Sequence, residues 1–485
     1  ALNPEGKAYP VLIEKIPTLK NNSAEVSFLE KANWGDGKPV TCEDLKFAWE
    51  VGKDPNVSSV AKEEYENIEK IEMNIKNPKK CKLTFRLAKW DFYLNFPRPI
   101  AAHLERPIFE ANKNQAQAYE RNSLFQRAPK TPGLYNGPYR VSELKMGSHV
   151  ILEPNPYFYG KAPYFQKVVI KFILNSATME ANLRSGNVDM TSSSGLSFDQ
   201  ALNFEKKIVS ENLNYKVIFV PGVIFAHVDF NLDHEVLKDL RVRKAFMHAV
   251  NKEEMTKAFF EGKQKPALHF STELDPWYTA NPKEISIYPY DKKKAADLLQ
   301  QAGWILNEKD GYRYKDGKKL MLTITSAADN KLNETIQVFI KSAFKEVGAD
   351  LSIKNYPARV LFAEILRKRN FDLGFYSWVS SPGSGQRNTF HSQMIPTEKN
   401  MWSGSNRPGW KNKNVDQWTD AFDTEFNEKK RIALMKKIMK VYTEELPAMP
   451  MYYRSNNSVV PKGLKNYQVS GHNYSEFLKI EEWSF

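Results

Sequence analysis

The residues best placed to bind a ligand lie in and just after the segment from Phe371 to Trp378. Apolar and other side chains alternate along this segment, and a period of two is typical of a strand with one buried face. Beyond Trp378 the residues are mainly Ser, Pro and Gly, which indicate that the strand ends in a surface loop. The last backbone N–H and C=O groups of such a strand are free to pair, and an extended peptide could bind them by strand addition. The alternative is an ordinary exit from a strand into a loop.

The candidate ligand contacts come from this strand and from the polar region that follows it. Among the histidines we retain only His391, because it lies in the Gly- and Ser-rich region after Trp378. His248 lies in an apolar-rich predicted helix at 239–250, and we interpret it as a partly buried structural residue. The candidate ligand-binding residues are Tyr376, Ser377, Trp378, Ser380, Ser381, Asn388, His391, Trp402 and Asn406.

The sequence lacks the common catalytic and cofactor motifs. It contains no G-x-G-x-x-G after a strand, no Walker P-loop, no G-x-S-x-G and no H-E-x-x-H. The eight histidines form no i, i+4 pair, and no carboxylate pair stands in the apolar setting that general acid–base catalysis needs. We therefore predict a binding protein with no catalytic residue, no metal and no cofactor. A peptide hydrolase with a scattered site is the less favoured alternative.

The composition is that of an ordinary globular protein with more than one lobe. The 485 residues are too many for one compact core, and 41% of them are hydrophobic and 26% charged. No apolar run approaches the roughly 18 residues that span a bilayer. The formal net charge is +13, but the lysines are spread without a dense basic run, so we predict no nucleic-acid partner. The only cysteines, Cys42 and Cys81, could form one disulfide in an oxidising compartment or remain two buried thiols.

The predicted elements that would position these residues alternate between strands and helices. Strands are predicted at 320–325 and 351–356, on either side of a helix that ends at Gly348. Apolar residues at i, i+3, i+4 and i+7 predict a helix that begins at Asp239. The near-continuous apolar run from Lys167 to Leu174 predicts a buried strand. This alternation indicates α/β lobes.

Five stretches resemble, in the same order, motifs of the extracytoplasmic solute-binding proteins of the oligopeptide/dipeptide class of ABC importers. Each stretch is short, but together they extend over much of the chain, and weaker resemblance continues through Asn414 to Asp416 and Pro447. The five are WGDGKPVTCED at 34–44, NGPYRVSELKMGSHVILEPNPYFY at 136–159, SGNVD at 185–189, DLRVRKA at 239–245 and YDKKKAADLLQQAGW at 290–304.

The resemblance implies an α/β fold of the periplasmic-binding-protein-like type II class, with two lobes that close over a ligand by hinge motion. Lobe I would contain 1–11, 133–235 and 456–485, with an extra subdomain at 12–132, and lobe II would contain 236–455. In such proteins the strand that ends at the position of Trp378 lies along the bound peptide. The family normally has several tens of residues before the position of Ala1, so we expect the N-terminal part of lobe I to be absent from this chain.

The implied function is extracytoplasmic capture of an oligopeptide, bound in extended form between the lobes, for an ABC importer. The implied partners are a peptide or other small solute and the permease subunits of the importer. We expect a bacterial periplasmic or cell-surface location and a monomer that is peripheral to the membrane. A lipoprotein anchor is compatible with this interpretation.

Ser381 is the main departure from the family pattern. Dipeptide and oligopeptide binders usually have an Asp at this position, which pairs with the α-ammonium group of the peptide. A hydroxyl cannot form that charge-assisted bond, so we predict weak dependence on a free amino terminus.

The alternative within the same fold is another ligand, either an oligosaccharide or a murein-type peptide. Tryptophans would stack on sugar rings and asparagines would bond to their hydroxyls, although packing within the lobe is an equal interpretation of these residues. The residues concerned are Trp378, Trp402 and Trp410 with Asn388, Asn400 and Asn406.

Overall fold

A computed structural model describes residues 1–58, 62–94, 96–193, 195–472 and 476–485. The chain divides into two compact units, and two long strands, β8 (Tyr215–Phe230) and β15 (Ala448–Pro461), each begin in one unit and end in the other. Unit 1 contains Ala1–Ile218, Asn457–Ser470 and residues 476–485, and unit 2 contains Phe219–Asn456 with Gly471 and His472. The lobe boundaries at 235 and 456 and the separate subdomain at 12–132 stay predictions.

The first part of unit 1 is built on a four-stranded antiparallel sheet. Its order is β1 (Leu19–Lys20), β2 (Ser23–Ser27), β4 (Lys80–Phe85) and β3 (Ile68–Met73). Buried and less buried residues alternate along β2 and β4, so one face of the sheet forms a core. The helices of this part are α1 (Cys42–Lys53), α2 (Lys62–Asn67), α3 (Ala102–Asn112), α4 (Ala118–Asn122) and α5 (Leu124–Arg127).

Cys42 and Cys81 form a disulfide that joins the first residue of α1 to β4. The two cysteines are 0% and 5% exposed, so the bridge lies inside the core. The structure therefore contains the first of the two alternatives that the sequence left open. The core residues that surround the bridge include Ala24, Val26, Phe28, Trp34 and Leu83.

The rest of unit 1 contains a three-stranded antiparallel sheet in the order β5 (Tyr139–Lys145), β6 (His149–Pro154) and β7 (Val168–Lys171). The predicted buried strand at 167–174 was wrong, because β7 is an edge strand and Val169 is 42% exposed. Tyr139 shares one core with residues near the end of the chain. These partners are Val460, Leu464, Ile480 and Trp483. The helices here are α6 (Ser176–Arg184) and α7 (Phe198–Ser210).

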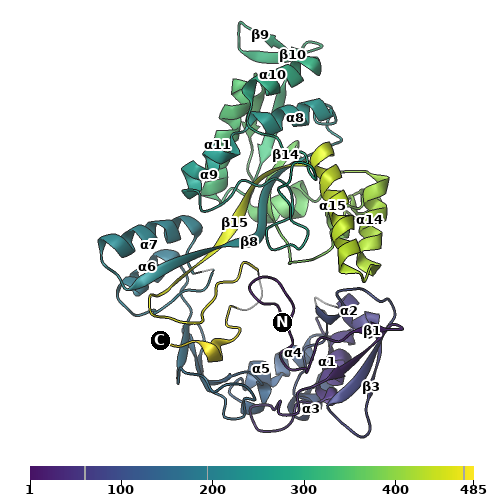
Figure 1. Ribbon diagram of the computed structural model, residues 1–485, viewed down its shortest axis with the longest axis vertical. Helices are drawn as coiled ribbons and strands as arrows, with labels where there is room; N and C mark the ends of the chain where they lie inside the picture. Colours follow the sequence, from purple (N-terminus) through teal and green to yellow (C-terminus); the bar gives the residue numbers. More distant parts are fainter. Residues whose placement is uncertain (59–61, 95, 194, 473–475) are drawn as a thin grey trace. The chain divides into compact units, whose positions relative to one another are not determined.

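Unit 2 is built on a mixed five-stranded sheet (Figure 1). Its order is β13 (Asp350–Ile353), β12 (Met321–Thr325), β14 (Leu373–Val379), β8 and β15. β12 runs parallel to β13 and β14, and β14 runs antiparallel to β8. The first four residues of β14 are all buried. The expectation of a single buried face was wrong for this part of the strand, because the face that carries Tyr376 is covered as well, through packing with Leu361 and Leu366.

Helices of unit 2 pack around this sheet. α8 begins after Asp239, whose carboxylate accepts a hydrogen bond from the N–H of Arg241 at 2.9 Å, and its Phe246 stacks on Phe344 of α11. The last two long helices, α14 and α15, pack side by side (Figure 1). The longer helices are α8 (Leu240–Ala249), α9 (Lys252–Phe260), α10 (Lys292–Gln301), α11 (Lys331–Glu346), α14 (Lys413–Thr424) and α15 (Glu428–Glu445). A small sheet contains β9 (Ile305–Asn307), β10 (Tyr312–Lys315) and β11 (Lys318–Lys319).

The described residues contain neither a membrane-spanning helix nor a metal-binding cluster. None of their helices has both the length and the apolar character needed to cross a bilayer. No group of three or more His, Cys, Asp or Glu side chains among them could hold a metal ion.

Candidate ligand-binding site

The second half of β14 has a neighbouring strand on one side only. β8 pairs with the whole of β14, from Leu373 to Val379. β12 pairs on the other side with Leu373 and Gly374 alone. Within the part of the chain that the structure describes, no strand pairs with that side from Phe375 onward. The sheet therefore has an open edge at the place where the sequence predicted an exit to the surface.

The backbone groups at this open edge belong to Ser377 and Val379. Just before β14, the C=O of Asp372 accepts a hydrogen bond from the N–H of Asn231. Just after β14, the N–H of Ser380 donates to the C=O of Val223 in β8. In an antiparallel pair, successive residues direct their backbone groups to alternate sides of the strand. Ser377 and Val379 are each an odd number of residues from these two positions, so their N–H and C=O groups face away from β8.

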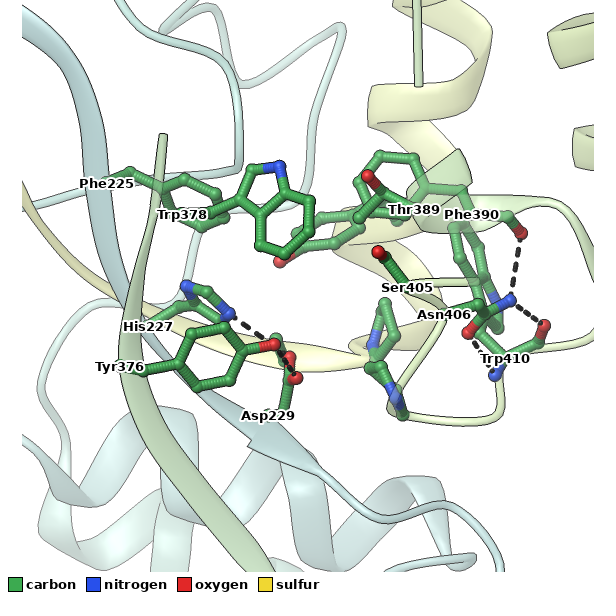
Figure 2. A pocket seen from close by; sticks show the side chains of 14 residues that line it. Phe225, His227, Asp229, Tyr376, Trp378, Thr389, Phe390, Ser405, Asn406 and Trp410 are labelled. Carbon is green, nitrogen blue, oxygen red and sulfur yellow. Dashed lines mark hydrogen bonds and ion pairs between the residues drawn. The ribbon is translucent and has the colours of Figure 1, made fainter. Parts of the chain in front are cut away.

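Tyr376 and Trp378 project from the same face of β14 into a small pocket (Figure 2). The cavity volume is about 20 Å³, which is room for about one water molecule. Phe225 and His227 of β8 lie opposite them in register and complete this wall. The other lining residues are Asp229, Thr389, Phe390, Ser405, Asn406, Pro408, Trp410, Tyr442, Pro447 and Ala448.

A buried polar cluster lies at one end of this wall (Figure 2). The phenol of Tyr376 donates to one carboxylate oxygen of Asp229 at 2.5 Å, and Nε2 of His227 lies 3.3 Å from the other. Burial and the neighbouring carboxylate raise the pKa of Tyr376 well above its usual value, so the phenol keeps its proton and remains a donor. The Nδ1 atom of His227 is buried and has no hydrogen-bond partner among the described residues.

Of the residues predicted as ligand contacts, the structure brings Tyr376, Trp378 and Asn406 to the pocket. The amide of Asn406 is engaged in holding the surrounding loop, because it donates to the C=O groups of Phe390, His391 and Trp410. Its carbonyl oxygen accepts from the N–H of Trp410. Asn406 therefore shapes the pocket through internal bonds.

The serines and Asn388 lie beside the pocket. The backbone N–H and C=O groups of Ser377 lie at the open edge of β14, and Ser381 is exposed in the loop that follows. The hydroxyl of Ser380 lies 3.2 Å from that of Ser384. The amide of Asn388, in α13 (Arg387–Phe390), donates to the hydroxyl of the pocket residue Ser405 at 3.1 Å.

His391 and Trp402 lie outside the pocket lining. His391 is 4% exposed, its Nδ1 accepts from the N–H of Gln393, and its Nε2 lies 3.4 Å from the carboxylate of Asp420 in α14. The C=O of Trp402 accepts a hydrogen bond from Arg367. Their roles as ligand contacts stay predictions.

Sequence reasoning missed the contribution of β8 to the pocket. Phe225, His227 and Asp229 are spaced two residues apart, and this spacing places them on one face of a strand. That signal was present in the sequence. Their position opposite Tyr376 and Trp378 depends on the register between β8 and β14, which are more than a hundred residues apart in the chain and have no local sequence signal for their pairing.

Residues 9–393 match the model of the bacterial extracellular solute-binding proteins, family 5. Among curated relatives, the chain is 24% identical over 483 residues to the oligopeptide-binding protein AppA of Bacillus subtilis. The aligned region covers 97% of this chain and 82% of that protein.

Solved structures show the same fold. One is the oligopeptide-binding protein of Thermus thermophilus with a pentapeptide, at a TM-score of 0.69 and 26% identity over 99% of this chain and 89% of that chain. Another is NikZ of Campylobacter jejuni with Ni(L-His), at a TM-score of 0.74 and 24% identity over 100% of this chain and 92% of that chain. The predicted fold class, the type II periplasmic-binding-protein fold, is confirmed by these neighbours. The chain belongs to the bacterial extracellular solute-binding proteins of family 5.

Proposed function

We propose that this protein captures oligopeptides outside the bacterial cytoplasm, in the periplasm or at the cell surface, for an ABC importer. The observation that supports the proposal best is the open edge of β14 beside Trp378. A peptide in extended form has the same spacing of N–H and C=O groups as a strand and can add to such an edge. The relatives named as oligopeptide-binding proteins support the same ligand class.

In the proposed complex, the peptide backbone bonds to Ser377 and Val379, while side chains of the peptide contact the aromatic wall formed by Trp378 and its neighbours. Main-chain bonds do not depend on the peptide's sequence, so they favour binding of many peptides. The aromatic wall adds apolar area that is already fixed in place.

The proposal assigns a binding role without catalysis. The protein would act as a monomer that is peripheral to the membrane and would pass its peptide to the permease subunits. The exposed hydroxyl of Ser381 replaces the carboxylate expected for recognition of an α-ammonium group, so the proposed site does not require a free amino terminus.

Oligosaccharides are not favoured, because two of the residues suited to sugars are engaged within the protein. The ring of Trp410 is 3% exposed and packs against Phe390 and Tyr442, and the amide of Asn406 bonds within its loop. Metal chelates are a further test case, since a neighbour of the same fold was solved with Ni(L-His).

A thermal-shift experiment tests the proposal. The purified protein is heated with a pool of tri- to pentapeptides, with a pool of oligosaccharides and with nickel–histidine, each in a separate sample. A ligand at about a hundred times its dissociation constant stabilises the protein by about 2.7 kcal/mol. Stabilisation by peptides supports the proposal. Stabilisation by sugars or by nickel–histidine alone overturns the ligand class while leaving the family assignment intact.

A further inference from the structure

The loop that follows β14 begins with a tight turn. The N–H of Ser384 donates to the C=O of Ser381 at 3.0 Å. The two residues between them are Pro382 and Gly383. Gly383 has a φ of +76°, and a Pro followed by a left-handed Gly is typical of a type II turn. The turn starts two residues after the end of β14, so it lies directly beyond the open edge of the strand.

The buried carboxylate of Asp275 bonds to the centre of this turn. In a turn of this type, the backbone N–H of the third residue has no partner within the turn. That N–H belongs to Gly383, which is buried, and it donates to Oδ1 of Asp275 at 3.1 Å across 108 positions of the chain. A buried N–H without an acceptor is costly, so Asp275 satisfies a group that the turn cannot satisfy by itself.

Asp275 is itself fixed by the segment that contains it. Its Oδ2 atom accepts from the hydroxyl of Ser271 at 2.8 Å and from the N–H of Thr272 at 3.0 Å. This segment is attached to β15, because the hydroxyl of Tyr453 donates to the C=O of His269 at 3.0 Å. The carboxylate therefore links the turn to the main sheet of unit 2.

The loop also packs closely against α14 just after the turn. A Cβ atom added at Gly385 would lie 2.8 Å from Oδ1 of Asp423 and 3.2 Å from the ring of Phe422. Before the turn, the N–H of Ser380 still donates to β8. The loop is therefore held on both sides of the turn, and Asp275 holds its centre.

The carboxylate of Asp275 is costly to bury. Burial raises the pKa of Asp275 above its usual value, because the loss of water outweighs the three hydrogen bonds that favour the charged form. A carboxyl group whose pKa is raised by folding lowers the stability of the folded state at neutral pH. A neutral side chain of the same shape would avoid this cost. The turn that Asp275 holds therefore explains its position better than a contribution to stability does.

We propose that Asp275 is a positioning residue of the candidate site, and that it holds the turn at 381–384 in the conformation that receives the peptide. This inference rests on the proposed function and adds to it a residue that acts through the turn. A peptide bonded to Ser377 and Val379 would run along the edge of β14 toward the exposed Ser381. Because the turn is ordered beforehand, little backbone entropy is lost there on binding.

The experiment compares Asp275→Asn with Asp372→Asn. An amide has one oxygen, so the first variant cannot accept from both Gly383 and Thr272 as the two carboxylate oxygens do. Asp372 is the matched control, because its carboxylate also accepts from a backbone N–H, that of Thr323 at 2.9 Å, but at the opposite end of β14.

Three quantities are measured for the wild-type protein and both variants. Calorimetry gives the dissociation constants of four pentapeptides, Ala-Ala-X-Ala-Ala with Ala, Phe, Lys or Glu at X. Hydrogen exchange with single-residue fragmentation gives the exchange rate of the Gly383 amide, with and without peptide. Urea unfolding at pH 7 gives the stability of each folded protein.

Asp275→Asn should weaken binding of every peptide that the wild-type protein binds by about 5- to 30-fold, because the turn must then be ordered on binding. Asp372→Asn should change these constants by less than about twofold. The Gly383 amide of free Asp275→Asn should exchange at least about tenfold faster than in the wild type, and peptide should restore part of this protection. The urea midpoint should change little, because loss of the buried charge offsets loss of a hydrogen bond. A merely structural role predicts instead that stability and affinity fall together.

Three results would overturn the inference, and only one of them would also overturn the proposed function. Unchanged peptide affinity in a folded Asp275→Asn variant removes the inference and leaves peptide capture intact. Equal weakening by the two variants does the same, because the effect is then not specific to the turn. Failure of the wild-type protein to bind any of the four peptides overturns both.

If Asp275→Asn does not fold, the free wild-type protein decides the question. Slow exchange of its Gly383 amide supports a turn that is held before binding. Exchange as fast as in an unfolded chain overturns the inference.

Discussion

Removal of the disulfide between Cys42 and Cys81 should destabilise the first part of unit 1. The bridge joins residues that are 39 positions apart, and closing a loop of this length in the unfolded chain corresponds to about 4 kcal/mol in the loop-entropy model. Both cysteines lie in the core, so the reduced thiols remain buried and the packing changes little. The expected loss is therefore mainly an effect on the unfolded state.

Hydrogen exchange followed by mass spectrometry measures this effect locally. The oxidised protein, the protein reduced with a phosphine, and the Cys42→Ala/Cys81→Ala double variant are compared. Backbone amides of β2 and β4 should exchange about a thousandfold faster in the reduced protein, which is the factor that corresponds to about 4 kcal/mol. The alanine variant should lose more than the reduced protein, because it also lacks the two buried sulfur atoms.

Two results would refute this reasoning. If β2 and β4 exchange at the same rate with and without the bridge, the loop that it closes does not limit their opening. If β12 and β14 of unit 2 lose as much protection as β2 and β4, the effect is not confined to the core that contains the bridge.

Three further predictions concern the candidate site and the core of unit 2. Trp378→Ala should weaken peptide binding about 30-fold, as loss of a central aromatic contact of about 2 kcal/mol does, while Trp418→Ala on α14 should have little effect in the same calorimetric titration. Acetylation of the peptide's amino terminus should change the dissociation constant by less than about threefold, because Ser381 cannot pair with an ammonium group; loss of binding on acetylation would contradict this. Burial lowers the pKa of His269 to about 4. Between that pH and about 6.5 the unfolded chain binds the extra proton, so folding stability should fall on acidification, by about 3 kcal/mol from this residue alone. Urea unfolding at pH 7 and pH 4.5 should show a smaller loss for His269→Gln, and equal losses would contradict the assignment.

Local signals in the sequence predicted individual elements well. The helix predicted to begin at Asp239 does so, because the capping carboxylate and the apolar spacing are both encoded within a few residues. The helix that ends at Gly348 and the strands on either side of it are also present. The family resemblance supplied the fold class, which short motifs in a fixed order can identify even at low identity.

Burial and pairing could not be predicted in the same way. The run at 167–174 is apolar enough for a buried strand, yet it forms an edge strand with exposed side chains, since no second neighbour among the described residues pairs with it. The first half of β14 is buried on both faces, since Tyr376 packs with Leu361 and Leu366 on the face that the alternation predicted to be exposed. Both outcomes depend on contacts between distant parts of the chain, and alternation along one segment contains no information about them.

The candidate site shows the same difference between local signals and contacts from distant parts of the chain. The sequence pointed to the end of β14 and to Tyr376 and Trp378, because the change from alternating residues to Ser, Pro and Gly is local. It did not point to Asp229 or His227, which reach the site through the register between β8 and β14. Ser381 could be interpreted only by comparison with the family pattern.

The way the chain divides between the two units also sets an order for folding during synthesis. Apart from a short stretch that begins at Gly471, unit 2 is one continuous segment, Phe219–Asn456, so a ribosome delivers its sheet and helices without interruption. Unit 1 is different, because Tyr139 shares its core with Val460 and Trp483. More than 300 residues must be translated between these partners. The β5–β7 sheet therefore emerges long before its core partners, and it is the part of the molecule that depends most on protection until translation ends.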